Sequence, residues 1–131
     1  MEILQKFIVF ALVVEKNLME KRFGIKGKEM KTFNYLENEV EIWGYARGIV
    51  QNGTPLGQAK KTLEETNELI AAIAIDNKDE IIDAIGDIVV TLIMQCAIQK
   101  VTLTECLEHA YNQIKDRKGY LNAEGIFVKE S

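Results

Sequence analysis

The chain has 131 residues, of which 47% are apolar and 27% charged, and its net charge is −4. This length and composition predict one domain with a real core, and we expect residues 1–131 to form it. The acidic balance argues against general nucleic-acid affinity. Two cysteines and one histidine offer no zinc-type ligand set. Because Cys96 and Cys106 have apolar neighbours, we expect both to be reduced core residues.

The first predicted helix runs from Glu2 to about Arg22 and is apolar over a broad side. It fits either a core helix or a subunit interface, because a buried helix looks the same in both cases. The apolar run at 7–14 is far shorter than the ~20 residues that span a bilayer. A basic start and a cleavage site are also missing. We therefore expect a cytoplasmic protein with no membrane partner. Gly24 and Gly27 end the helix.

A second helix is predicted from about Lys31 to Val50, before Asn52 and Gly53. Trp43 and Arg47 lie one turn apart on it, an arrangement that suits stacking on a base and holding a phosphate. A core tryptophan with a surface arginine is the simpler alternative.

Two acidic helices joined by a short polar turn at 76–79 occupy residues 54–99. A connection this short predicts an antiparallel hairpin. Thr54 and Pro55 suit the N-cap and first position of its first helix. Carboxylates three, four or seven residues apart share one face of a helix. Those of the first helix are Glu64, Glu65 and Glu68, and those of the second are Glu80, Asp83 and Asp87.

These carboxylates would repel one another across the hairpin unless a cation compensates them. Oxygen ligands without Cys or His suit Mg²⁺, and Mn²⁺ as a second choice. The acids of the first helix alone would fit a solvated stripe of charge better than a metal site. The second helix is almost entirely apolar around Asp83 and Asp87, where an unpaired acid is costly, and this favours a metal site. The opposite face of the first helix should dock on the bundle. That face carries Ala59, Leu63, Thr66, Ile70 and Ile73.

Basic residues near these helices are candidates for binding a phosphate. Lys61 lies one turn before Glu64 and Glu65, where an ordinary helical ion pair is equally expected. The last helix starts at a Thr102–Glu105 capping box. It ends in Lys115, Arg117 and Lys118, a cationic last turn that the helix dipole also favours. The tail from residue 120 is expected to be extended, with strand content near zero.

The run Glu64-Glu65-x-x-Glu68, followed after the turn by Glu80-x-x-Asp83, resembles a family signature. It is similar to the EExxE…ExxD pattern of the MazG-like all-α nucleoside triphosphate pyrophosphohydrolases. The segments DAIGDIVV and IKDRKGYLNAEGIFVKE resemble the small stand-alone members from bacteria and phages. The resemblance covers about residues 52–130.

The second motif departs from the family pattern in one respect. In many members the E-x-x-D directly precedes the long apolar run. In that register Asp87 matches the aspartate, and Ala84 stands where a glutamate is expected. One turn earlier, Glu80-x-x-Asp83 is intact and Asp87 is an additional acid. Both registers stay open.

The resemblance implies an all-α bundle of about five helices around the acidic hairpin. It implies Mg²⁺-dependent hydrolysis of ribo- or deoxynucleoside triphosphates to the monophosphate and pyrophosphate, with Glu64 or Glu65 as the general base. The metal-ligand candidates are Glu65, Glu68, Glu80, Asp83 and Asp87. The substrate-binding candidates are Lys61, Trp43, Arg47, Lys115, Arg117 and Lys118.

A homodimer or homotetramer is expected, because a flat acidic hairpin needs covering to make a closed pocket and family members usually assemble. The alternative from another class is a non-catalytic helical protein that keeps the acidic site for nucleotide binding, regulation or structure. The alanine at position 84 favours this alternative.

Overall fold

The computed structural model describes residues 2–23 and 30–130. It divides into two compact units, residues 1–36 and 37–131. The regular structure of the described residues is six helices and one small β-hairpin, which confirms the predicted all-α class. That the two units form one domain stays a prediction.

The first unit contains α1 (Glu2–Phe23), close to the predicted bounds. Large apolar side chains of α1 are exposed all along the helix. They are Ile3, Leu4, Phe7, Ile8, Val9, Phe10, Leu12, Val13, Val14 and Leu18. This unit therefore buries none of them in a core of its own, which agrees with the interface alternative for this helix. Gly24 and Gly27, the predicted end of the helix, lie outside the described residues.

The predicted single helix from Lys31 to Val50 is wrong. The chain forms α2 (Phe33–Ala46) and a short α3 (Ile49–Asn52), separated at Gly48. Gly48 has φ 76°, a left-handed conformation that glycine adopts without steric cost, and this ends α2. Gly53 then closes α3 through its N–H, which donates to Ile49 O.

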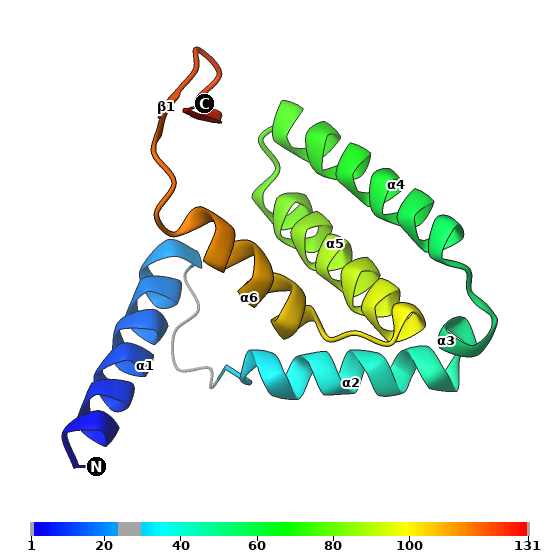
Figure 1. Ribbon diagram of the computed structural model, residues 1–131, viewed down its shortest axis with the longest axis horizontal. Coiled ribbons are helices and arrows are strands. Elements are labelled where there is room, and N and C mark those ends of the chain that lie inside the picture. Colours follow the sequence, from blue (N-terminus) through cyan, green and yellow to red (C-terminus); the bar gives the residue numbers. More distant parts are fainter. Residues whose placement is uncertain (1, 24–29, 131) are drawn as a thin grey trace. The chain divides into compact units, whose positions relative to one another are not determined.

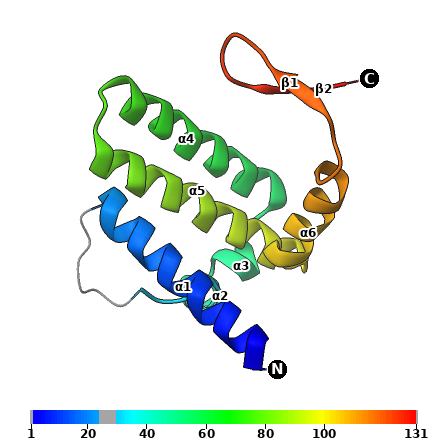
Figure 2. The same cartoon turned by 90° about the vertical axis from the view of Figure 1, so that its left-hand side faces the viewer.

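The second unit is built on a hairpin of two long helices, α4 (Pro55–Ala74) and α5 (Lys78–Gln99). They lie side by side and antiparallel in both views (Figures 1 and 2). Thr54 caps α4 by accepting a hydrogen bond from Gly57 N at 3.0 Å. Asn77 caps α5 by accepting one from Glu80 N at 3.2 Å. The connection is residues 75–77, shorter than the predicted turn.

The core of the second unit lies around α5, which contacts α3, α4 and α6. The small side chains of Ala72 and Ala84 are buried where α4 meets α5. Met94 is fully buried, and Gly44 of α2 lies directly against its side chain. Among the described helices, α5 alone is long and apolar enough to cross a membrane by length and composition. Its contacts with three helices bury part of that apolar sequence, whereas Ile82 and Ile85 are 45% and 50% exposed.

The C-terminal part follows α5 with α6 (Leu103–Ile114), which starts at the predicted Thr102–Glu105 capping box. Cys106 on α6 is exposed, so its predicted place in the core is wrong, whereas Cys96 on α5 is buried as predicted. Burial, together with the neighbouring Cys106, raises the pKa of the Cys96 thiol to about 11. Both cysteines are free thiols.

The tail, predicted to be extended, forms a β-hairpin of β1 (Gly119–Leu121) and β2 (Phe127–Lys129). Tyr120 pairs with Val128 in the antiparallel register. The Asn122 side chain accepts hydrogen bonds from Glu124 N and Ile126 N and so shapes the turn. These three-residue strands are the only strands of the described residues.

The outer face of α4 was expected to dock on the bundle, and it does not do so within the chain. Leu63, Ile70 and Ile73 are 62%, 60% and 57% exposed. On a helical wheel they lie away from α5 and opposite the acids of α4. The hairpin therefore has one acidic face and one exposed apolar face.

Two helical glycines provide a test of this packing. We expect Gly44→Ala to destabilise the fold by about 1–2 kcal/mol, because its methyl group would overlap the buried Met94 side chain. Gly86→Ala is the matched control, since nothing lies within 4 Å of the added carbon. It should stabilise the fold by about 0.5–1 kcal/mol through helix propensity. Urea unfolding measures both variants, and equal stabilisation by both would contradict the packing at Gly44.

Candidate metal centre

Three carboxylates of α4 form a cluster: oxygen atoms of Glu64, Glu65 and Glu68 all lie within 4.8 Å of one another. Glu64 and Glu68 are exposed, whereas Glu65 is only 7% exposed and lies on the side of α4 that packs against α5. Glu65 Oε2 is buried and accepts no hydrogen bond. A carboxylate oxygen in that position is costly unless a proton or a cation compensates it.

Lys61 supplies part of that compensation. Its Nζ lies 3.1 Å from Glu64 Oε1 and 3.2 Å from Glu65 Oε1. The ion pairs to both glutamates raise the pKa of Lys61. This confirms the helical ion pair that we weighed for Lys61, whereas phosphate contact stays a prediction.

The acids of α5 share this electrostatic environment. Burial raises the pKa of Asp87, and the negative charges of Asp83 and Glu65 raise it further, while Lys61 lowers it. The neighbouring Glu65 carboxylate raises the pKa of Glu68, because only protonated Glu68 can donate a hydrogen bond to it and because its negative charge disfavours a second one. Carboxylates from both helices therefore act on one another.

The pairing of the helices shows which acids share a level along the hairpin. Thr62 of α4 contacts Thr91 of α5, and antiparallel helices pass each other residue for residue. Glu65 follows Thr62 by three residues on α4, so it lies beside residues 87–88, which precede Thr91 by three to four residues on α5. By the same count Glu80 lies at the level of Ile73, about 7 Å nearer the turn than Glu68. Ala84, the position of the missing glutamate, is buried between the helices.

This donor set fits a hard divalent cation. All the candidate ligand atoms are carboxylate oxygens, which suit Mg²⁺ or Mn²⁺. The buried, unpartnered Glu65 Oε2 provides a lone pair without a donor. Sequence patterns identified these acids but placed the buried one on the wrong helix. Asp83, expected among packed apolar residues, is exposed, Asp87 is part-buried, and Glu65 of α4 is the buried acid.

The other predicted substrate-binding residues are not joined to this cluster by any hydrogen bond or ion pair of the described residues. Trp43 is 44% exposed. The backbone N–H of Arg47 donates to the carbonyl oxygen of Trp43, which is an ordinary hydrogen bond of the helix backbone. Lys115, Arg117 and Lys118 follow α6 and are exposed. Their roles toward a substrate stay predictions.

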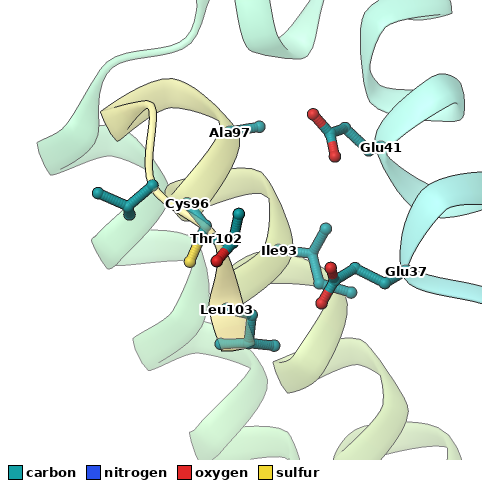
Figure 3. Close-up of a pocket in the computed structure, with 8 residues that line it drawn as sticks. Glu37, Glu41, Ile93, Cys96, Ala97, Thr102 and Leu103 are labelled. Carbon is teal, nitrogen blue, oxygen red and sulfur yellow. The ribbon is translucent and has the colours of Figure 1, made fainter. Parts of the chain in front are cut away.

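A separate small cleft of about 60 Å³ lies between α2, α5 and the start of α6. Figure 3 shows the carboxylates of Glu37 and Glu41 on the side of the cleft opposite Cys96 and Thr102. Two carboxylates line it, but its volume is far less than a small-molecule site needs. The acidic residues of α4 are not among its lining residues.

Comparison with known proteins identifies the acidic hairpin. Residues 54–121, just over half of the chain, match the model of the MazG nucleotide pyrophosphohydrolase domain. The chain belongs to the MazG family. The matched part begins at the N-cap of α4 and ends with β1, so it contains all six candidate carboxylates of α4 and α5.

One curated relative of this MazG chain comes from Haemophilus phage HP1 (strain HP1c1). It is an uncharacterized 18.2 kDa protein in the rep–hol intergenic region, 34% identical over 65 residues. The match spans 50% of this chain and 40% of the relative, so the chain covers less than half of that protein. No solved structure matches the chain.

The raised pKa of Asp87 predicts how the stability of the metal-free protein depends on pH. As the pH rises above about 4, Asp87 ionises earlier in the unfolded chain than in the folded one, so the free energy of unfolding falls. The Asp87→Asn variant has no ionisable group at this position, so its free energy of unfolding should not fall for this reason. Relative to wild type, the variant is therefore expected to gain stability from pH 4 to pH 7. Urea unfolding in chelator measures this, and a pH-independent difference would contradict it.

Proposed function

We propose that this MazG chain hydrolyses nucleoside triphosphates, ribo- or deoxy-, to the monophosphate and pyrophosphate with Mg²⁺. The observation that carries the proposal is the buried, unpartnered Glu65 Oε2 at the centre of a carboxylate cluster inside the matched domain. A cation at this place would offset the repulsion that raises the pKa values of Glu68 and Asp87.

We assign the metal to Glu65, Glu68, Asp83 and Asp87, with Glu80 at the turn-side end of the line. A divalent ion held by these carboxylates would supply charge to neutralise the triphosphate and would lower the pKa of an attacking water. Mn²⁺ suits the same oxygen ligands and is the expected substitute.

The protein groups at the rim have roles that follow from their charge and exposure. Glu64 is an exposed member of the cluster and accepts the proton of the water as general base, with Glu65 as the alternative. Lys61 has a side chain that is about half exposed and already lies at the cluster, so it is placed to hold a phosphate oxygen. Trp43, Arg47 and the cations after α6 stay secondary candidates for the base and phosphates.

The test is pyrophosphate release from a panel of ribo- and deoxynucleoside triphosphates, with Mg²⁺, with Mn²⁺ and with chelator. Metal-dependent release of pyrophosphate together with the monophosphate is the expected result. Nucleotide binding without turnover would instead support the non-catalytic alternative, in which Ala84 has removed a needed ligand. Release of inorganic phosphate alone would contradict the proposed cleavage site.

Substitution of a single metal-ligand residue should reduce turnover without changing the fold. Glu68→Gln and Asp83→Asn are each expected to lower turnover by at least about 100-fold. Loss of a residue that only orients a metal ligand already lowers metal affinity or activity by about 10–100-fold. Helix content by circular dichroism should stay unchanged, since both residues are exposed. Full activity in both variants would reject the site.

Glu80→Gln adds the comparison between the two motif registers. A loss equal to that of Asp83→Asn supports the Glu80-x-x-Asp83 register. A small loss, with a large one for Asp87→Asn, supports the register in which Ala84 replaces the glutamate.

We further propose that the chain works in the cytoplasm as a homodimer or homotetramer. The supporting observation is the amount of apolar surface that the described residues leave exposed. On α4 it includes Leu56, Leu63, Ile70 and Ile73, and on α6 it includes Leu107, Tyr111 and Ile114. None of the side chains named here is charged, unlike those of the acidic face of the hairpin.

The double variant Leu63→Gln with Ile70→Gln tests this assembly. Both side chains are exposed in the single chain, so the fold should survive while self-association weakens by at least about 10-fold. Ala71→Gln, exposed on another side of α4, is the matched control. Sedimentation equilibrium measures all three proteins, and a monomeric wild type or an unchanged double variant would contradict the proposal.

A further inference from the structure

Three side-chain hydrogen bonds join α4 to α5 among the described residues. Gln95 Nε2 donates to Pro55 O at 2.9 Å, Gln58 Nε2 to Thr91 O at 3.5 Å, and Thr62 Oγ1 to Thr91 Oγ1 at 2.9 Å. All three lie in the half of the hairpin that is remote from the turn at 75–77. The short turn constrains one end of the helix pair, and these bonds constrain the other.

The bond between the two threonines is the one that connects two side chains, and it is well protected. Thr91 is only 4% exposed. Its hydroxyl donates to Ile88 O at 2.7 Å, so its oxygen is left to accept a hydrogen bond from Thr62. The Thr62 hydroxyl is also 3.1 Å from Gln58 O, a second acceptor within its own helix.

The two other cross-helix hydrogen bonds come from the long side chains of Gln95 and Gln58, which can follow a shift between the helices more easily than two threonines can. Ala72 and Ala84 pack in the other half of the hairpin, and contact between small apolar side chains is non-directional. A slip of one turn would shift α5 by about 5.4 Å along α4. Such a slip removes the hydrogen bond that the buried Thr91 oxygen accepts from Thr62, while the bond from Thr91 to Ile88 O within α5 remains. A single polar pair in an apolar helix interface specifies register in this way.

This pair lies next to the candidate metal centre on both helices. Thr62 precedes Glu65 by three residues, and Thr91 follows Asp87 by four, so each threonine is one turn from an acid. We propose that the Thr62–Thr91 hydrogen bond positions the metal centre by holding the register in which Glu65 lies level with Asp87. The threonines are positioning residues, because they act through the acids. The inference rests on the proposed function for its link to the metal.

Substitutions at Thr91 test the link to the metal through binding of Mn²⁺ alone, measured by calorimetry without nucleotide. Thr91→Val keeps the shape but removes the hydroxyl, and it should weaken Mn²⁺ binding by about 10-fold or more. Thr91→Ser keeps the hydroxyl and should restore affinity to near the wild-type value. Thr62→Val removes the donor from the other side and should resemble Thr91→Val, which keeps the test decisive if one variant fails to fold.

Thr66→Val is the matched control. The Thr66 hydroxyl is part-buried and also adjoins Glu65, but it donates within α4, to Thr62 O at 2.8 Å. Its loss should leave Mn²⁺ affinity unchanged. Equal weakening by Thr66→Val and Thr91→Val would overturn the proposal, as would wild-type affinity in Thr91→Val.

A cysteine experiment measures the register itself and does not depend on metal. In a chain with Cys96→Ala and Cys106→Ala, the pair Glu65→Cys with Asp87→Cys should oxidise to a disulfide faster than Leu69→Cys with Asp87→Cys, which is one turn out of register. Adding Thr91→Val should reduce that preference, and an unchanged preference would overturn the proposal. A wild type that binds no Mn²⁺ would reject the proposed function, while the cysteine preference still decides the register.

Discussion

The packing of α4 against α5 places a carboxylate where a helix pair ordinarily buries an apolar side chain. Glu65 lies in that contact, and its one ion pair leaves the second oxygen without a donor. The desolvation of Glu65 therefore opposes hairpin packing, and a cation at the site would relieve both the desolvation and the repulsion among its neighbours. Fold stability and ligand affinity are coupled through this one residue, as is common at functional sites.

The hairpin was predictable from the sequence because its signals are local. Thr54 and Pro55 mark a helix start, and the apolar sequence of α5 marks a long helix, which its neighbours cover only in part. The break between α2 and α3 was missed because the apolar spacing continues through it, while Gly48 takes a left-handed conformation. The outer face of α4 was misjudged for a different reason: periodicity identifies an apolar face but not what covers it.

The candidate site was likewise predictable in its local features and not in the contacts between helices. The spacing of the acids predicted one face on each helix, and that spacing needs only helical geometry. The level at which the two faces meet depends on contacts between helices, here the bond between Thr62 and Thr91. Threonines inside a helical pattern carry no sign of such a role, since in most helices their hydroxyls bond back to their own backbone. Because the sequence does not show where the two helices meet, it also left open how the second acidic motif aligns with the family pattern.

The three-residue connection between α4 and α5 also has a consequence for the order of folding. Contacts between helices that are neighbours in the sequence close small loops, at little cost in chain entropy, and such contacts form early. The α4–α5 pair is therefore the expected nucleus of the second unit. A nucleus that forms early would expose the apolar outer face of α4 to solvent until another chain binds to it. Such a transient species is prone to aggregate at high protein concentration, so refolding yield should fall as the chain is concentrated.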